Sequence, residues 1–155
     1  MDAVAFRGKL MQKINIICVG KIKEKFYTDA VNEYMKRLSR FAKVEIREIP
    51  ECRTLSEEAE LILKSAKGRL IALCVEGKKY SSEALAQYIK QLTDTGNECT
   101  FVIGSSCGLA DAVKHKANIK LSFSDMTFPH QLMRVILLEQ VYRAFMINGG
   151  GEYHK

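Results

Sequence analysis

The chain has 155 residues, of which 47% are hydrophobic and 27% are charged. This length predicts one domain with its own core, and this composition excludes a disordered or fibrous protein. The apolar runs are too short to span a bilayer, and residues 1–12 lack the apolar stretch of a secretory signal, so we expect no membrane partner. The net charge of +6 favours an anionic partner such as nucleic acid, although solubility alone also explains a mildly basic chain.

The cysteines predict neither a disulfide framework nor a metal site, because they are odd in number and show no C-x-x-C spacing. Free thiols fit a reducing compartment, so we expect a cytoplasmic protein without a metal cofactor. The cysteines are Cys18, Cys52, Cys74, Cys99 and Cys107.

Strand-like and helical patterns alternate along the chain. In chain order, we expect a strand at 14–20, a helix at 25–40, a strand at 44–49, a helix at 54–67, a strand at 70–75, a helix from 82, a strand at 100–104, a short helix at 109–116, a strand at 119–123 and a terminal helix from 129. The short apolar runs are typical of parallel strands that are buried on both faces. The alternation therefore predicts a single α/β domain over residues 13–155, with a mostly parallel sheet flanked by helices. Residues 1–12 are expected to be an extension, to which we assign no function.

Turn and capping residues set the expected boundaries of these elements. Thr54 has the position of a helix N-cap, and Ser82 has the same position before the helix that follows the third strand. Residues 76–78 predict a turn at the end of that strand. Thr127 and Pro129 precede the terminal helix, and capping is the simplest role for Thr127.

Three loops at predicted strand ends are candidates for a ligand site, because ligands of open parallel sheets gather beyond the carboxyl ends of the strands. They are residues 73–77, 104–108 and 123–128. The loop at 104–108 is neither a P-loop nor a dinucleotide fingerprint, and its glycines allow close approach of a ligand or of a neighbouring loop. In the third loop Ser124 offers a hydroxyl, and the sequence leaves open whether Asp125 contacts a ligand.

The terminal helix is apolar almost all round between Leu132 and Ile147. A domain of this size rarely surrounds a helix completely, so we expect it to pack against a second subunit; burial inside one chain is the alternative. Arg134 is one of its polar exceptions. Glu139 and Arg143 are spaced i,i+4, which allows an ion pair.

Histidines mark both ends of this carboxyl-terminal region. His130 in the first turn of the terminal helix fits a structural role as well as a catalytic one, whereas His115 lies between two lysines and predicts solvent exposure. His154 follows three glycines at 149–151. Those glycines either let the tail fray, which is the simpler expectation, or let it close over a site.

Several of these motifs together match one family. The segments that carry the match are residues 14–27, 101–104, 121–130, 134–145 and 153–155. Over residues 13–155 the chain resembles the 23S rRNA (pseudouridine-1915-N3) methyltransferase family, whose members are small SPOUT proteins. The resemblance implies the SPOUT α/β-knot fold, with a deep trefoil knot in the carboxyl-terminal half, a rare exception to unknotted topology.

The resemblance also implies a ligand and partners. It implies S-adenosylmethionine (SAM) as methyl donor, a homodimer with each active site at the subunit interface, and no DNA partner. The implied substrate is a pseudouridine of 23S rRNA, methylated at N3 on the assembled ribosome. By position, the donor-binding residues are Leu73, Gly104, Phe123, Ser124, Asp125, Met126, Thr127 and Phe128.

The same match gives the polar tail a chemical role. Methylation at N3 must release an imide proton, for which His154 is a candidate base. Tyr153 is a candidate for stacking on the flipped base, and Arg143 for stabilising charge on its carbonyl. The alternative is that the tail only orders RNA and closes the pocket. The competing functions are a related SPOUT methyltransferase of tRNA and a non-catalytic, ribosome-associated RNA-binding module.

The chain departs from the family pattern at three places. Ser105 stands where relatives often have a second glycine, and Glu152 where they often have proline or a small residue. The segment at 51–54 is shorter than in relatives. None of these departures removes a residue that the chemistry needs.

Overall fold

The computed structural model describes residues 11–155. Its strands are β1 (Gln12–Val19), β2 (Ala42–Ile49), β3 (Arg69–Lys79), β4 (Cys99–Ile103) and β5 (Ile119–Ser122). Its helices are α2 (Lys25–Leu38), α3 (Leu55–Ser65), α4 (Ser82–Asp94), α5 (Asp111–Lys116) and α6 (His130–Asn148). The predicted extension at 1–12 lies outside the described residues except for its last two positions, and Gln12 already belongs to β1.

The strands of the described chain form one sheet in the order β2-β1-β4-β3-β5. β1 lies between β2 and β4, so that Ile16 aligns with Ile46 on one side and with Phe101 on the other. All four pairings between neighbouring strands are parallel, which confirms the predicted α/β class. Because parallel strands point the same way, the carboxyl ends of β3, β4 and β5 meet at one edge of the sheet.

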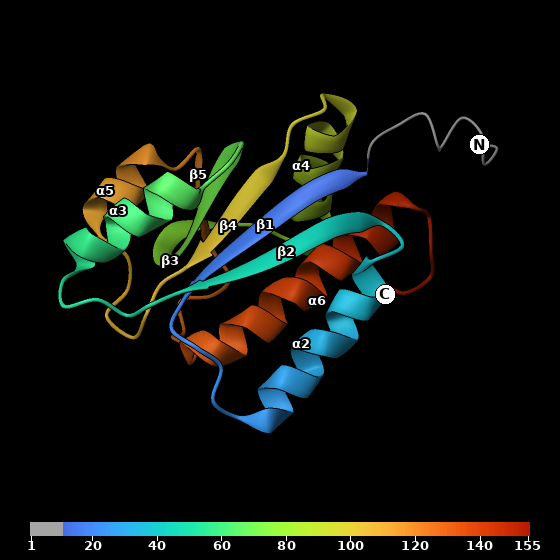
Figure 1. Cartoon of the computed structure of the whole chain (residues 1–155). Coiled ribbons are helices and arrows are strands. Elements are labelled where there is room, and N and C mark those ends of the chain that lie inside the picture. The colour runs from blue at the N-terminus through green and yellow to red at the C-terminus, as the bar shows by residue number, and fades with distance from the viewer. Residues whose placement is uncertain (1–10) are drawn as a thin grey trace.

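Helices cover both faces of this sheet (Figure 1). α2, α4 and α6 pack on one face, where Ile16 and Phe101 are buried. α3 and α5 pack on the other face, over Ile17 and Val102. Neighbouring strand residues therefore alternate between two apolar cores, which explains why the strands are continuous apolar runs in the sequence.

β3 continues past the turn predicted at 76–78, and that prediction was wrong. The strand runs to Lys79, and both Leu73 and Lys78 align with Leu121 of β5. The register thus jumps within β3, and the residues between the two aligned positions bulge out of the ladder. All other predicted boundaries differ from the observed ones by at most two residues.

Gly77 makes this bulge possible. A Cβ at this position would lie 2.6 Å from the carbonyl oxygen of Lys120, a distance that real side chains do not reach. The glycine therefore marks a close approach of β5 to β3, which the sequence pattern does not distinguish from a turn.

α3 and α4 each begin with a side-chain N-cap, and the cap of α4 lies one residue before the predicted position. Thr54 caps α3 by accepting a hydrogen bond from the N–H of Glu57 at 3.1 Å. α4 is capped by Ser81, which accepts from the N–H of Ala84 at 3.0 Å, and the prediction that Ser82 caps it was wrong.

The start of α6 has no side-chain cap. The residue before the helix is Pro129, and no side chain accepts from its first turn, so the capping role predicted for Thr127 was wrong. Ser82 instead donates its hydroxyl proton to Oε1 of Gln140 at 2.7 Å, which joins the start of α4 to the middle of α6.

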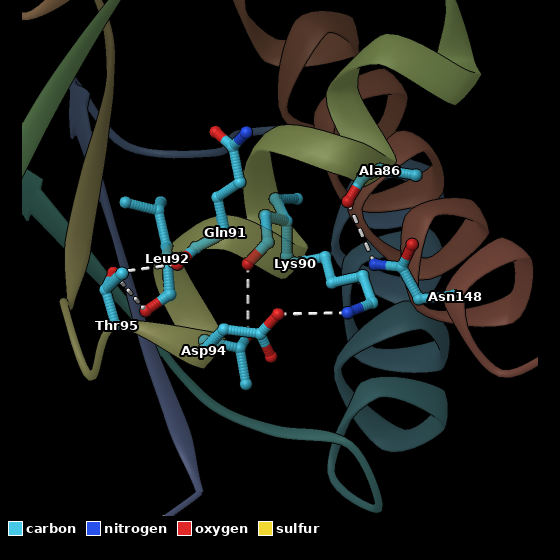
Figure 2. A network of polar contacts seen from close by, with 9 residues as sticks. Ala86, Lys90, Gln91, Leu92, Asp94, Thr95 and Asn148 are labelled. Carbon is cyan, nitrogen blue, oxygen red and sulfur yellow. Dashed lines mark hydrogen bonds and ion pairs between the residues drawn. The ribbon is translucent and has the colours of Figure 1, made fainter.

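The end of α6 is fixed to α4, as Figure 2 shows. Nδ2 of Asn148 donates to the carbonyl oxygen of Ala86 at 2.9 Å. The end of α4 is itself closed by Thr95, whose hydroxyl donates to the carbonyl oxygen of Gln91 at 2.7 Å. The chain therefore leaves α6 from a fixed point at Gly149.

A buried arginine ties α6 to the first half of the chain. The side chain of Arg134 is 1% exposed. Its guanidinium forms an ion pair with Glu48 of β2 and donates to the carbonyl oxygen of Gly20 at 2.7 Å. The same carboxylate accepts from the N–H of Ile22 at 3.0 Å. These bonds hold the loop between β1 and α2 against the first turns of α6.

α6 is only partly covered within one chain. Its buried residues include Leu137, Leu138, Val141 and Ala144, and its remaining apolar residues are half-buried. A second subunit that covers those residues stays a prediction, as does the trefoil knot.

Candidate functional site

A cavity of about 540 Å³ opens at the carboxyl edge of the sheet. Its walls come from the bulge in β3, the loops after β4 and β5, and the first turn of α6. This volume suits a ligand of cofactor size, and its position beyond the strand ends is the usual one for parallel sheets.

Seven of the eight residues expected to bind the donor line this cavity. They are Leu73, Gly104, Phe123, Ser124, Met126, Thr127 and Phe128. Asp125 does not line it, because its exposed carboxylate pairs with Lys79 at the end of β3. The fold therefore brings together the three strand-end loops that the sequence singled out.

The loop at 104–108 is a tight turn. The N–H of Gly108, a residue with a φ of +82°, donates to the carbonyl oxygen of Ser105 at 2.9 Å. A Cβ on Gly104 would lie 2.5 Å from the carbonyl oxygen of Gly108. Of the two explanations for the glycines, close approach of neighbouring backbone is thus the one observed. Gly104 and Ser105 still form part of the cavity wall.

The loop after β5 is held by hydrogen bonds at its start. The Ser122 hydroxyl donates to the carbonyl oxygen of Ser124, and the Ser124 hydroxyl accepts from the N–H of Met126, both at 3.0 Å. Within residues 11–155, no observed hydrogen bond uses the N–H of Thr127 or Phe128. Both amides therefore have no hydrogen-bond partner in the described part of the chain.

Two charged side chains line the cavity on the α5 side. Nζ of Lys114 lies 2.5 Å from Oε1 of Glu76. The hydrogen bond from Lys114 is the main cause that lowers the pKa of Glu76, and the same contact is the main cause that raises the pKa of Lys114. Both groups are therefore ionised at neutral pH. His130 lines the opposite part of the cavity, at the start of α6.

The terminal residues fold back onto α6 and do not fray. Gly150 has a φ of +73° and reverses the chain. The Tyr153 hydroxyl donates to Oε2 of Glu139 at 3.0 Å, and its ring packs edge-on against Tyr142 at 5.1 Å between centroids. The three glycines thus act as a turn that returns the tail to its own helix.

The three predicted catalytic residues lie together in one polar cluster. Arg143 donates to Oε1 of Glu139 through Nε at 3.0 Å and Nη2 at 2.8 Å, which confirms the predicted ion pair. Its Nη1 lies 3.1 Å from Nδ1 of His154, and its guanidinium lies over the Tyr153 ring at 4.7 Å. Nε2 of His154 contacts the carboxylate of Glu83 in the first turn of α4.

Burial and Glu139 raise the pKa of two tyrosines in this region. Burial, and then the hydrogen bond to Glu139, raise the pKa of Tyr153. The same two causes raise the pKa of Tyr34 to about 12. Tyr153 is therefore a hydrogen-bond donor at neutral pH. The sequence gives no local signal for Glu83, because its contact with His154 joins residues 71 positions apart.

The polar cluster and the cavity occupy different stretches of α6. Among the described residues, no member of the cluster lines the cavity. Between Met133, which lines the cavity, and Arg143 the helix rises by about 15 Å. The tail of one chain is therefore folded away from that chain's own cavity.

Exposed basic and aromatic side chains lie in the loop before α2 and in the first turn of α2, and this loop contacts the start of α6. Lys21 and Lys23 are exposed, and Phe26 is 63% exposed. The backbone N–H of Lys23 donates to Oε1 of Gln131 at 3.1 Å, next to His130 in the cavity wall. We call Lys21, Lys23 and Phe26 the α2 patch.

The family of the chain follows from comparison with known proteins. A family model described as a predicted SPOUT methyltransferase matches residues 12–154. The chain belongs to the SPOUT methyltransferase family. This assignment confirms the resemblance found in the motifs of the sequence, and its match begins at the first residue of β1.

Named SPOUT relatives match over nearly their whole length. A ribosomal RNA large subunit methyltransferase H from Streptococcus uberis is 48% identical, over 92% of this chain and 99% of its own. The protein of the same name from Clostridium novyi is 51% identical with the same coverage. A putative ribosomal RNA large subunit methyltransferase H from Methanococcus maripaludis is 49% identical.

Further observations on this SPOUT chain concern membrane-spanning helices, metal ligands and the thiols. Within residues 11–155, no helix is both long enough and apolar enough to cross a membrane. The described residues also contain no group of three or more His, Cys, Asp or Glu side chains placed to share a metal ion. All five cysteines are free thiols, and burial raises the pKa of Cys18 and of Cys99 to about 12.

Proposed function

We propose that this protein is a cytoplasmic, SAM-dependent methyltransferase of large-subunit rRNA that methylates N3 of a pseudouridine on the assembled ribosome. The observation that carries the proposal is the cavity built by three strand-end loops in a chain of the SPOUT methyltransferase family. The names of its relatives support large-subunit rRNA as the substrate. The resemblance of its motifs to the pseudouridine-N3 methyltransferases supports the finer assignment.

The chemistry of the cavity fits the donor. Its walls carry apolar side chains such as Leu73 and Phe123, which suit an adenine ring. The amides of Thr127 and Phe128 offer hydrogen bonds to acceptor atoms of the ring or ribose. When bound, SAM supplies an electrophilic methyl group. The residues of the three loops fix its position, and alignment accounts for much of the acceleration in such a displacement.

The polar cluster supplies the groups that act on the acceptor base. In this proposal His154 accepts the imide proton at Nδ1 once this nitrogen leaves Arg143, because Nε2 already carries the proton that it shares with the carboxylate of Glu83. Arg143 offers a guanidinium to the developing negative charge on a base carbonyl, and Tyr153 offers a ring for stacking. Positioning of RNA by the tail, without proton transfer, is the alternative role.

A homodimer would complete this site. The cluster and the cavity of one chain are separated along α6, and several apolar residues of α6 are only half-buried. We propose that α6 packs against a second copy and that the tail of one subunit serves the cavity of the other. The sedimentation coefficient of the purified protein tests the dimer directly.

The α2 patch is the proposed contact for the rRNA strand. Lysines neutralise phosphates, and an exposed aromatic ring stacks on an unpaired base. The double variant Lys21→Glu/Lys23→Glu is expected to weaken binding to an rRNA fragment and to reduce the salt dependence of that binding. Phe26→Ala is expected to weaken RNA binding about tenfold, the size of one lost stacking contact. Filter binding to an rRNA fragment over a salt series measures both effects.

A matched control for the α2 patch is Lys64→Glu on α3, which covers the other face of the sheet. It should leave RNA affinity unchanged. A Phe26→Ala protein that binds RNA normally but changes its oligomeric state would make Phe26 a subunit contact instead.

Cys74 reports on donor binding without any substrate. It lines the cavity and is half-buried, and burial is the main cause that raises its pKa. SAM is expected to slow alkylation of Cys74 severalfold, because the bound donor covers the thiol. Cys52 is also half-buried but lies outside the cavity, so its rate should not change. Peptide mass spectrometry with and without SAM measures both rates, and equal slowing at both thiols would contradict a local effect.

Methylation assays on defined substrates test the function itself. Ribosomes from a strain that lacks the corresponding methyltransferase should gain one methyl group at a pseudouridine of 23S rRNA, located by mass spectrometry of the digested RNA. Methylation of naked tRNA in preference to ribosomes would support the alternative function, that of a SPOUT methyltransferase acting on tRNA. Ribosome binding with no SAM binding in calorimetry would support the non-catalytic module.

A further inference from the structure

The cavity contains a charged pair that none of the expected donor-binding positions includes. Of the lining residues, Glu76 and Lys114 are those with an acidic or ammonium side chain, and they contact each other at 2.5 Å. Glu76 lies in the bulge of β3, and Lys114 lies on α5. The rest of the wall is formed by apolar, hydroxyl and glycine residues, together with Cys74 and His130.

The two side chains of the pair differ in solvent exposure. The side chain of Lys114 is 22% exposed, and that of Glu76 is 56% exposed. An ordinary surface pair of this protein, Lys90 with Asp94 on α4, is 58% and 59% exposed and lies outside the cavity wall. The ammonium group of Lys114 is thus partly shielded from solvent, in a cavity whose other lining residues are mostly apolar, hydroxyl or glycine residues.

We propose that Glu76 and Lys114 form a subsite for a free α-amino acid group, and that they hold the amino-acid end of the methyl donor. This inference rests on the proposed function, because it takes the cavity as the donor site. A free amino acid end carries one ammonium and one carboxylate. Lys114 donates to the ligand carboxylate, Glu76 accepts from the ligand ammonium, and the four charges alternate in sign.

The bulge in β3 explains how this subsite is built. The register between β3 and β5 jumps between Leu73 and Lys78, so residues 74–77 have no aligned partner in β5, and Glu76 among them contacts Lys114 of α5. Gly77 permits this path because no side chain would fit against Lys120. The subsite therefore depends on the same feature that the sequence pattern presented as a turn.

Two thioether ligands that differ only in the amino-acid end test the subsite. S-adenosylhomocysteine has that end, and 5′-methylthioadenosine has a methyl group in its place. We expect Lys114→Met to weaken S-adenosylhomocysteine about tenfold in titration calorimetry, the size of one lost charge-assisted hydrogen bond. Glu76→Gln should weaken it in the same direction. Neither variant should change the affinity for 5′-methylthioadenosine, because the adenosine part of the cavity is untouched.

Lys90→Met serves as the matched control, since it breaks an ion pair outside the cavity and should change neither affinity. Unchanged binding of S-adenosylhomocysteine by both cavity variants would overturn the subsite. An equal loss for the two ligands would also overturn it, since the pair would then only hold α5 to β3. If the unmodified protein binds neither ligand nor SAM, the proposed function itself fails, a result separate from either of these.

Discussion

Removal of Tyr153, His154 and Lys155 is expected to slow methyl transfer to ribosomes by about two to four orders of magnitude, the range of a lost general base with its positioning contacts. The affinity for SAM should stay unchanged, because none of the three residues lines the cavity of its own chain and because the proposed role of the partner's tail is at the acceptor base. Single-turnover transfer at saturating ribosome concentration measures the chemical step, and calorimetry with SAM measures donor binding. Loss of SAM binding would instead make the tail a structural part of the donor site.

Two single substitutions separate the roles within the tail. If His154 is the base, the rate of methyl transfer by His154→Ala should fall by about two to four orders of magnitude, the usual contribution of a general base. Lys155→Ala is the control, because Lys155 is exposed and lies outside the polar cluster. Near-normal transfer by His154→Ala on saturating ribosomes would rule out the base assignment and leave the tail with a positioning role.

Replacement of Glu48 by Gln is expected to lower the free energy of unfolding by about 1–3 kcal/mol, because it leaves a buried guanidinium without its counter-charge, although the carboxylate itself is 36% exposed. The side chain of Arg134 is 1% exposed, and one nitrogen of it, Nε, already has no partner among the described residues. The substituted glutamine would keep the shape of the side chain but not its charge. Urea unfolding at one fixed protein concentration measures the change.

The double variant Glu48→Gln/Arg134→Met provides the internal control. Removing both charges should recover part of the stability lost in Glu48→Gln, since apolar replacement of a buried ion pair is often nearly neutral. Lys90→Met should unfold like the unmodified protein, because that pair is solvent-exposed. A Glu48→Gln protein as stable as the unmodified one would mean that water reaches the guanidinium.

The sequence was sufficient to predict the layers and the location of the cavity, because both depend on local patterns. Apolar runs such as 14–20 and 100–104 had to be strands buried on both faces, and parallel strands place their end loops together. This rule predicts that the end loops lie together, and the family motif indicates which of their residues are expected to bind the donor. Asp125 lies outside the cavity wall, where it pairs with Lys79 at the end of a strand that was predicted to stop at residue 75, and its contact with the donor stays a prediction.

What the sequence could not predict depends on contacts between distant segments. Gly77 has the same local signature in a turn as in a bulge, and only the approach of Lys120 distinguishes the two. Likewise, Arg134 occupies a polar position in an apolar helix, which suggests an exposed side chain until Glu48 and Gly20 are placed beside it. The spacing of apolar residues along a helix does not indicate which strand or loop the helix packs against.

The contacts of Arg134 also determine when the fold can be completed during synthesis of the chain. Its partners Glu48 and Gly20 precede it by 86 and 114 positions, so they leave the ribosome long before it does. β1 likewise waits for β4 to cover its second edge. The amino-terminal half therefore emerges with an open strand edge and with a Glu48 carboxylate that lacks its counter-charge, and folding is completed only after most of the chain has been synthesised.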